Sequence, residues 1–284
     1  MQEEESNSAA WGIPASELEV DRKEIRDSMS IEQFSSVDQV HAHALKTLTA
    51  LQQYDTFMES IDTLAVLGCG KEGLDLEWWA TRTTRDEEDP LPLNIKCTGI
   101  DVVDKCKVSK KYDNVVYRKH EYFEKDQPVN DEFDVVWAHN VFHRSVDPLR
   151  TLGHWWRMTA PGGMLAMVVP HYTNFEFNKV AFEQPSYSYF NHTMVSLIYM
   201  LAVNGWDCAS GFFKKVPGDP WISAVVYKSS QEPRDPRTTS WYDLVDAKLL
   251  PQTADKSIKK HGFLVQQDLV LLWLDKNLTW LGHE

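Results

Sequence analysis

The sequence predicts an α/β fold: a mostly parallel sheet of seven strands, with helices on both faces and an antiparallel pair of strands at its end. Between residues 60 and 228, short apolar runs of strand length alternate with segments of helical periodicity. This alternation is typical of parallel sheets that helices cover on both faces. A glycine-rich turn directly after the first apolar run, and two final runs with no helix between them, complete the pattern.

The predicted elements follow one another in a regular order. Strands are expected at residues 64–67, 95–100, 115–118, 133–137 and 164–169, and the terminal pair at 206–213 and 221–227. Helices are expected at residues 31–58, 74–80, 149–158 and 194–203. Charged residues and two prolines predict a surface loop at 81–94, Pro161-Gly162-Gly163 predicts a turn after the third helix, and Gly205 stops the fourth.

Three regions are expected along the chain. Residues 1–29 are polar and charged, which predicts a flexible acidic N-terminal tail. Residues 30–228 form the α/β domain, and residues 229–284 form a C-terminal extension that packs on it. The apolar cluster LVLLWL at 269–274 is too short to cross a bilayer, so we expect it to be part of that packing.

Composition limits the possible partners. The chain has 284 residues, of which 43% are hydrophobic, and this is enough for a full core. A net charge of −13 repels phosphate backbones and anionic lipid, so we expect no nucleic-acid partner. The first residues, MQEEESNSAA, lack the apolar stretch of a signal peptide, and no apolar run reaches membrane-spanning length. The four cysteines form no CxxC pair and no zinc spacing, which favours reduced thiols in a cytoplasmic protein.

Two features predict a cofactor site at the start of the domain. The turn Gly68-Cys69-Gly70-Lys71-Glu72-Gly73 follows the first strand, and glycines allow a sharp turn in which main-chain atoms approach a ligand closely. The helix that begins after the turn adds unpaired N–H groups. Asp101 ends the second strand, where a carboxylate can accept both hydroxyls of a ribose. These two features alone fit either a nicotinamide cofactor or S-adenosylmethionine.

The segment 133–169 distinguishes these two cofactors. It contains Phe133-Asp134-Val135-Val136, then Val146-Asp147-Pro148, then Pro161-Gly162-Gly163. In this order of motifs the chain resembles the class I S-adenosylmethionine-dependent methyltransferases, in particular their broad group of enzymes that act on small molecules. The helix before the last two strands, followed by Gly205-Trp206, is also similar to that family. The resemblance covers about residues 60–228 and implies a Rossmann-like sheet.

The resemblance also implies roles for individual residues. Gly68, Cys69 and Gly70 would line the methionine part of the cofactor, Gly73 would also belong to the cofactor site, and Asp101 would bind the ribose. Glu121, or its neighbour Tyr122, falls near the position that meets the adenine amino group. Pocket-lining residues below the sulfonium would be Ala138, His139 and Asn140. Two departures stand out: Val66 occupies a position that is usually acidic in the family, and the third glycine comes one residue late.

Methyl transfer needs mainly a well-placed acceptor, and it needs a general base only if the acceptor must lose a proton. Candidates for that base follow the fourth and fifth strands, namely His139 and His171. For the acceptor pocket, further candidates are His143, His192 and a group of aromatic residues: Tyr172, Phe175, Phe177, Tyr187, Tyr189 and Phe190. The pair of histidines in HNVFH lacks the glutamate and the third ligand of a zinc site, so no metal is expected.

The sequence therefore favours an enzyme that uses S-adenosylmethionine to methylate an oxygen or nitrogen of a small molecule, or of a glycan- or lipid-linked acceptor. Two alternatives stay open. A nicotinamide-dependent oxidoreductase could use a related sheet, although the chain has no YxxxK motif. A catalytically lapsed methyltransferase-like binding protein would account for Val66 and for the shifted third glycine.

Overall fold

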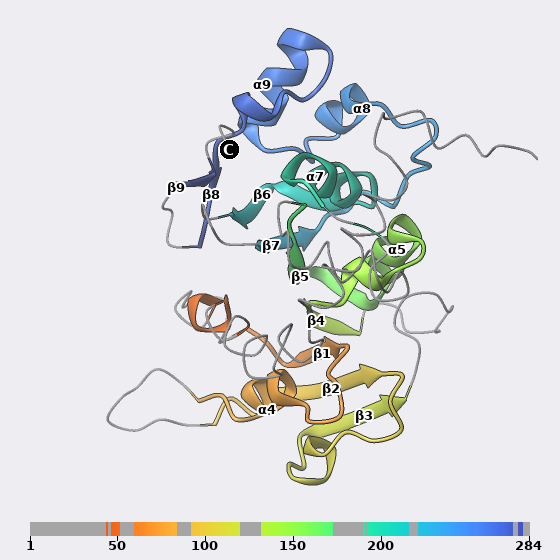
Figure 1. The fold of residues 1–284 in the computed structure, drawn as a ribbon, viewed down its shortest axis with the longest axis vertical. Coiled ribbons are helices and arrows are strands. Elements are labelled where there is room, and N and C mark those ends of the chain that lie inside the picture. The colour runs from red at the N-terminus through yellow and green to blue at the C-terminus, as the bar shows by residue number, and fades with distance from the viewer. Residues whose placement is uncertain are drawn as a thin grey trace, which may run out of the picture. The chain divides into compact units, whose positions relative to one another are not determined.

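A computed structural model describes most of the chain from residue 44 onward (Figure 1). The described residues are 44, 47–51, 60–83, 92–119, 132–172, 190, 192–215 and 221–274, with the backbone of 278–280. The chain divides into two compact units, residues 1–39 and 40–284, and every described residue belongs to the second. The predicted tail at 1–29 and most of the predicted helix at 31–58 lie outside the described residues.

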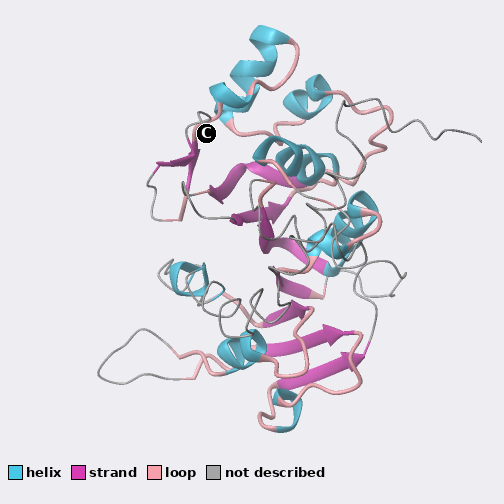
Figure 2. Cartoon of the chain, in the orientation of Figure 1, coloured by secondary structure: helices cyan, strands magenta, loops and turns pink. Residues whose placement is uncertain are grey.

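Seven strands form one sheet, as the sequence predicts (Figure 2). They are β1 (Thr63–Leu67), β2 (Lys96–Asp101), β3 (Val115–Lys119), β4 (Phe133–His139), β5 (Thr159–Pro170), β6 (Trp206–Lys214) and β7 (Trp221–Lys228). Their order is β3-β2-β1-β4-β5-β7-β6. The first five strands are parallel to one another, and β7 pairs antiparallel with both β5 and β6. The strand order reverses between β1 and β4, and ligands of open α/β sheets bind beyond the carboxyl ends of the strands at such a point.

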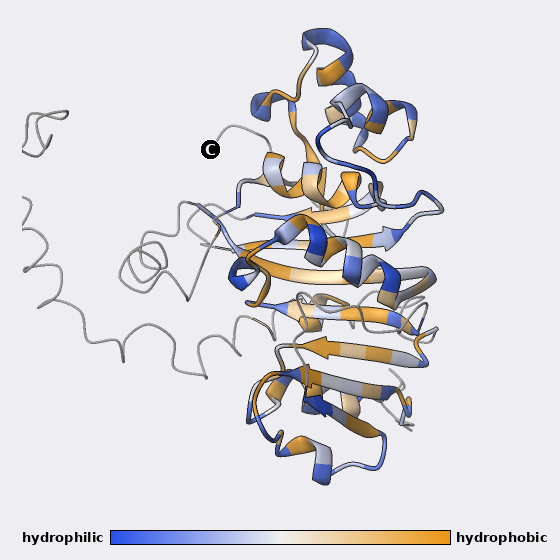
Figure 3. Cartoon of the chain, turned by 90° about the vertical axis from the view of Figure 1, so that its right-hand side faces the viewer, coloured by the Kyte–Doolittle hydropathy of each residue, from blue (hydrophilic) through white to orange (hydrophobic). Residues whose placement is uncertain are grey.

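The main helices cover both faces of this sheet. They are α4 (Leu74–Ala80), α5 (Pro148–Met158) and α7 (Met194–Val203). Side chains that alternate along β4 belong to two hydrophobic clusters: Val136 and Ala138 pack on the side of α5 and α7, and Val135 and Trp137 pack on the side of α4. Hydrophobic residues accordingly concentrate on the central strands (Figure 3). Burial on both faces explains why these strands read as continuous apolar runs in the sequence.

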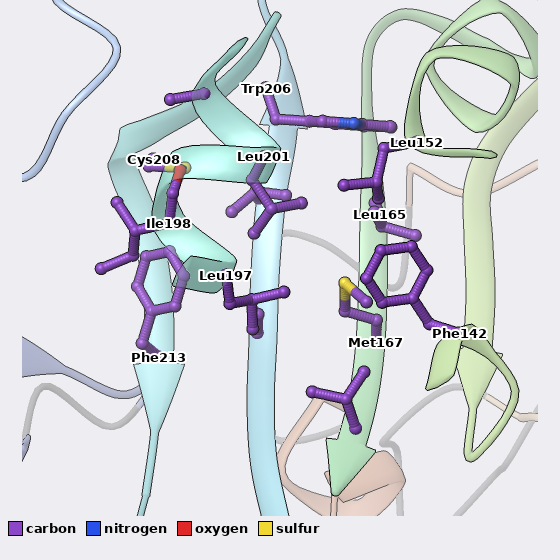
Figure 4. Packing of buried hydrophobic residues seen from close by; sticks show 14 of the residues in the cluster. Phe142, Leu152, Leu165, Met167, Leu197, Ile198, Leu201, Trp206, Cys208 and Phe213 are labelled. Carbon is purple, nitrogen blue, oxygen red and sulfur yellow. The ribbon is translucent and has the colours of Figure 1, made fainter. Parts of the chain in front are cut away.

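The cluster on the side of α5 and α7 is the larger of the two (Figure 4). In it Leu197 and Leu201 of α7 face Leu165 and Met167 of β5, and Trp206 lies beside Leu152 of α5. All of these side chains are buried. This packing holds α5, α7 and the strands behind them in place, and therefore fixes where β4 and β5 end.

The segment around Pro161-Gly162-Gly163 differs from the predicted turn. Strand β5 already begins at Thr159 and includes these residues, and its register with β4 shifts between Phe133 and Val135. A side chain at Gly163 would place its Cβ 2.8 Å from the carbonyl oxygen of Asp134, so this backbone lies directly against β4. The chain therefore bends inside an irregular strand, and not in a separate turn.

Two of the sequence motifs, Val146-Asp147-Pro148 and the aspartate of Phe133-Asp134-Val135-Val136, have structural roles. Asp147 caps α5, because its side chain accepts a hydrogen bond from the N–H of Arg150 at 3.0 Å, and Pro148 occupies the first helical turn. Asp134 joins β4 to the start of β1: its Oδ2 accepts from the N–H groups of Asp62 and Thr63 at 3.0 and 2.8 Å. Asp134 lies near the start of β4, away from the carboxyl ends of the strands, and both aspartates support the fold.

The C-terminal residues add α8 (Trp241–Asp246), α9 (Gln252–His261) and a short pair of strands, β8 (Leu271–Leu272) and β9 (Leu278–Trp280). Leu244 of α8 and Ile258 of α9 lie in the same hydrophobic cluster as α7. Cys208 of β6 also donates its main-chain N–H to the carbonyl oxygen of Leu249 at 3.0 Å. These elements thus pack along α7 and the edge of the sheet at β6. None of the helices in the described part of the chain has both the length and the hydropathy to cross a membrane.

Candidate functional site

The glycine turn after β1 has an open side at Gly70. Gly70 has a φ of +68°, a conformation that is strained for other residues. A Cβ built on Gly70 would meet no heavy atom of the described residues within 4 Å. The main chain of the turn is therefore open beside Gly70, as a cradle for a ligand requires.

Gly73 is needed for a different reason. It begins α4 with a φ of +69°, and its Cβ would lie 2.6 Å from Sγ of Cys106 and 2.9 Å from the side chain of Val108. The glycine here allows the helix to pack closely on the segment after β2. Its α-carbon faces the protein interior, whereas that of Gly70 faces open space.

Asp101 lies directly beside this turn. Its Oδ2 accepts a hydrogen bond from the N–H of Gly70 at 2.7 Å, and its Oδ1 accepts from the N–H of Val103 at 3.2 Å. Tyr117 of β3 holds the strand end in place by donating its hydroxyl to the main-chain oxygen of Asp101 at 3.1 Å. A carboxylate has about four acceptor positions, so two remain after these bonds. The structure thus brings together the two features that the sequence singles out for a cofactor.

Two other residues of the predicted cofactor site turn their side chains inward. Cys69 packs under the turn with its Sγ 3.0 Å from the position of a Cβ on Gly99, and burial raises the pKa of its thiol. Ala138 is fully buried in the cluster on the side of α5 and α7. Only their main-chain atoms could line a cofactor.

His139 is the last residue of β4 and lies between two indole rings. Its imidazole is nearly parallel to the ring of Trp137, at a centroid distance of 6.1 Å and an angle of 5°, and it lies 6.1 Å from the ring of Trp221. Its Nδ1 is 4.0 Å from Oδ2 of Asp75, in the first turn of α4. The same oxygen accepts a hydrogen bond from Nε1 of Trp137 at 2.9 Å.

Asn140 follows His139 in a strained backbone conformation, with a φ of +55°. Its N–H donates to the carbonyl oxygen of Val168 at 2.9 Å, so the chain turns away from the sheet at the tip of β4. The residue is 9% exposed, and its Oδ1 has no hydrogen-bond partner among the described residues. A buried amide oxygen of this kind is costly unless a ligand or water donates to it.

The remaining histidines of the predicted site are buried at the ends of β4 and β5. His143 lies in a short 3-10 helix (Phe142–Arg144), and the backbones of His171 and His192 form an isolated bridge. Burial lowers the pKa of His171 and of His192 to about 4, and it lowers the pKa of His143 well below its usual value. These three imidazoles are neutral at physiological pH, and a pKa near 4 makes His171 a weak base. In the described segments, no three His, Cys, Asp or Glu side chains are placed to hold a metal ion.

The low pKa values predict that folding stability falls in mild acid. The unfolded chain takes up protons near pH 6.5, whereas His171 and His192 in the folded protein do so only near pH 4, so the unfolded state binds more protons between these values. We expect the free energy of unfolding to drop by about 1–2 kcal/mol between pH 7 and pH 6. Urea denaturation at the two pH values measures this. A His192→Gln variant should show a smaller drop, and an equal drop in both proteins would contradict the assignment.

Several predicted site residues fall outside the described part of the chain. They are Glu121, Tyr122, Phe175, Phe177, Tyr187 and Tyr189. Of the aromatic group, Tyr172 and Phe190 are described, and both are exposed. Tyr172 lies against the ring of His171 at a centroid distance of 4.5 Å. It therefore offers an aromatic surface next to the end of β5.

Asp75 and Trp137 are site residues that sequence reasoning missed. An aspartate in the first turn of a helix is common because it interacts well with the helix dipole, so Asp75 carries no functional signal in the sequence. Trp137 reads as one more apolar residue of β4. Strand geometry places Trp137 beside His139, and only the packing of α4 on β4 brings Asp75 to both of them.

Comparison with known families agrees with this arrangement. Residues 66–167 match a sequence family described as "Methyltransferase domain". The matched region runs from the end of β1, through the glycine turn and Asp101, to β5. Over these residues the chain is similar to a methyltransferase domain, in agreement with the resemblance that the sequence motifs indicate.

Several solved structures are similar to parts of this chain at low sequence identity. A 1,6-didemethyltoxoflavin-N1-methyltransferase from Burkholderia thailandensis is 13% identical with a TM-score of 0.49, and the match covers 78% of this chain and 93% of that one. The N-methyltransferase NodS from Bradyrhizobium japonicum WM9 is 13% identical with a TM-score of 0.46, and the match covers 65% of this chain and 86% of that one. The CurJ carbon methyltransferase is 18% identical with a TM-score of 0.46, and the match covers 59% of this chain. The present chain spans about half (48%) of the CurJ chain. No curated protein sequence matches the chain.

Proposed function

We propose that this protein transfers a methyl group from S-adenosylmethionine to an oxygen or nitrogen of a small molecule, or of a glycan- or lipid-linked acceptor. The observation that carries the proposal is the contact between the glycine turn and the carboxylate of Asp101, 2.7 Å from the N–H of Gly70, with open space beside Gly70. A nucleoside needs both features at one place: main chain that it can approach, and a carboxylate for its ribose.

The residues present suit this cofactor. The two unused acceptor positions of Asp101 match the two hydroxyls of a ribose. The main chain at Gly68 and Gly70 would carry the amino-acid part, and the unpartnered Oδ1 of Asn140 would accept a hydrogen bond from the cofactor or the acceptor. Bound S-adenosylmethionine would supply an electrophilic methyl group at this end of the sheet.

The acceptor would lie beyond the ends of β4 and β5. There the exposed rings of Tyr172 and Phe190 offer apolar contacts. The main-chain N–H groups of these two residues donate to the carbonyl oxygens of the buried His192 and His143. If the acceptor must lose a proton, His139 is the better base. Burial holds the pKa of His171 near 4, and His139 has a carboxylate 4.0 Å away.

Charge and cysteines support a proposal about the partners and the compartment of the protein. Lys107 pairs with Glu72 at 2.7 Å, and Lys111 pairs with Glu77. Two lysines of the segment after β2 therefore lie beside carboxylates of the glycine turn and α4. With a net charge of −13, we favour acceptors other than nucleic acid. The four cysteines are buried free thiols, which suits a protein of the reducing cytoplasm.

Calorimetric titration with S-adenosylhomocysteine and, separately, with NADH tests the proposal. We expect saturable binding of S-adenosylhomocysteine and none of NADH. Binding of NADH alone would favour the oxidoreductase alternative. If S-adenosylhomocysteine binds but a screen of acceptors with radiolabelled S-adenosylmethionine stays blank, the lapsed binding protein becomes the better account.

A further inference from the structure

The packing of α4 on β4 places a carboxylate beside the imidazole at the end of β4. Side chains alternate along a strand, so Trp137 and His139 point to the same face of the sheet, which is the face that α4 covers. Asp75 lies in the first turn of α4. Its Oδ2 accepts the indole N–H of Trp137 at 2.9 Å and lies 4.0 Å from Nδ1 of His139.

The orientation of His139 is restrained on several sides. Its side chain is 3% exposed, and the rings of Trp137 and Trp221 each lie 6.1 Å from it. Of its two ring nitrogens, Nδ1 is the one that lies 4.0 Å from Asp75.

Asp75 is itself held in place. Its carboxylate is 17% exposed, so it is only partly screened by water. The hydrogen bond from Trp137 fixes the oxygen that faces His139. His143 also interacts with His139, and burial keeps the pKa of His143 far below its usual value, so His143 brings no positive charge near neutral pH.

We propose that Asp75 is a positioning residue that holds His139 in the tautomer with its proton on Nδ1, so that Nε2 is the proton-accepting nitrogen. A carboxylate next to one imidazole nitrogen favours the tautomer protonated there. The catalytic use of this arrangement rests on the proposed function. A proton from an acceptor O–H or N–H would move to Nε2 of His139, and the electron pair of that bond would stay on the acceptor atom. The distance of 4.0 Å is longer than a hydrogen bond, and such contacts often tighten when a ligand binds.

NMR of the histidine side chains tests this without cofactor or acceptor. In protein labelled with ¹⁵N-histidine, long-range ¹H–¹⁵N spectra distinguish the two tautomers, and a His139→Gln variant assigns the signals of His139. We expect wild-type His139 to be mainly Nδ1-protonated above pH 7, the opposite of the tautomer that free imidazole side chains prefer. In Asp75→Asn this preference should be lost.

A matched control removes a nearby charge that does not face His139. Glu72 lies in the same glycine turn and pairs with Lys107 on the surface, so Glu72→Gln should leave the tautomer unchanged. Wild-type His139 in the Nε2-protonated form would overturn the proposal, whether or not Asp75→Asn folds. Equal tautomer populations of His139 in the wild type and in a folded Asp75→Asn variant would also overturn the proposal. Failure of the wild-type protein to bind S-adenosylhomocysteine would instead contradict the proposed function and leave this result standing.

Discussion

Replacing Asp101 with alanine is expected to weaken binding of S-adenosylhomocysteine by roughly 5- to 150-fold, which corresponds to about 1–3 kcal/mol. The variant loses the carboxylate that would accept the ribose hydroxyls. It also loses the acceptor that holds the N–H of Gly70 at 2.7 Å, so the turn itself becomes less well ordered. Isothermal titration calorimetry of the two proteins measures the difference.

Asp104 provides the control for this variant. It lies three residues further along the same loop, is exposed, and pairs with Lys119 at the surface. Asp104→Ala removes the same charge without touching the turn, so its affinity should stay within about twofold of wild type, because exposed ion pairs contribute little. Unchanged affinity in Asp101→Ala would remove Asp101 from the site. Equal losses in both variants would point to net charge as the cause.

Replacing Gly73 with alanine is expected to lower the free energy of unfolding by about 2–4 kcal/mol. Two costs add up at this position. The φ of +69° is strained for alanine, and the new methyl group would lie 2.6 Å from Sγ of Cys106 in a packed interior. Urea denaturation monitored by tryptophan fluorescence measures the loss.

Gly70→Ala separates these two costs. Gly70 has nearly the same φ, +68°, but open space where the methyl group would go. This variant should lose only about 1–2 kcal/mol of stability, from backbone strain. It should bind S-adenosylhomocysteine much more weakly, because the methyl group occupies the cradle. Equal stability of the two variants would contradict the packing account of Gly73, and normal binding by a folded Gly70→Ala would show that the turn is not a ligand cradle.

Much of the fold could be predicted from the sequence because its strands are buried on both faces. The apolar run at 133–137 is visible without any knowledge of its neighbours, since every side chain of a central parallel strand needs an apolar environment. The glycine turn and Asp101 could be found in the same way. Both belong to a local pattern of strand, turn and strand end, which the chain carries within about 40 residues.

Other features could not be predicted, because they depend on contacts between distant segments. The sequence suggested both His139 and His171 as candidates for a base, and their neighbours in the fold separate them: Asp75 lies 4.0 Å from His139, whereas burial lowers the pKa of His171 to about 4. No local pattern in the sequence shows that the side chain of Asp134 accepts a hydrogen bond from the start of β1. The glycines at 162 and 163 predict a turn in the sequence, and only the structure shows that the backbone at Gly163 lies against β4.

By itself, the order of apolar runs and glycines along the chain determined the class of fold, the position of Asp101 at the end of the second strand and the family resemblance. These depend on backbone geometry and burial, which repeat with fixed spacing and so leave a linear pattern. The tertiary structure alone decided which side chains meet at the ends of the strands, and what charge they carry there. Asp75 and His139 are 64 positions apart in the sequence and 4.0 Å apart in the fold, and both electrostatic interaction and desolvation depend on distance in space.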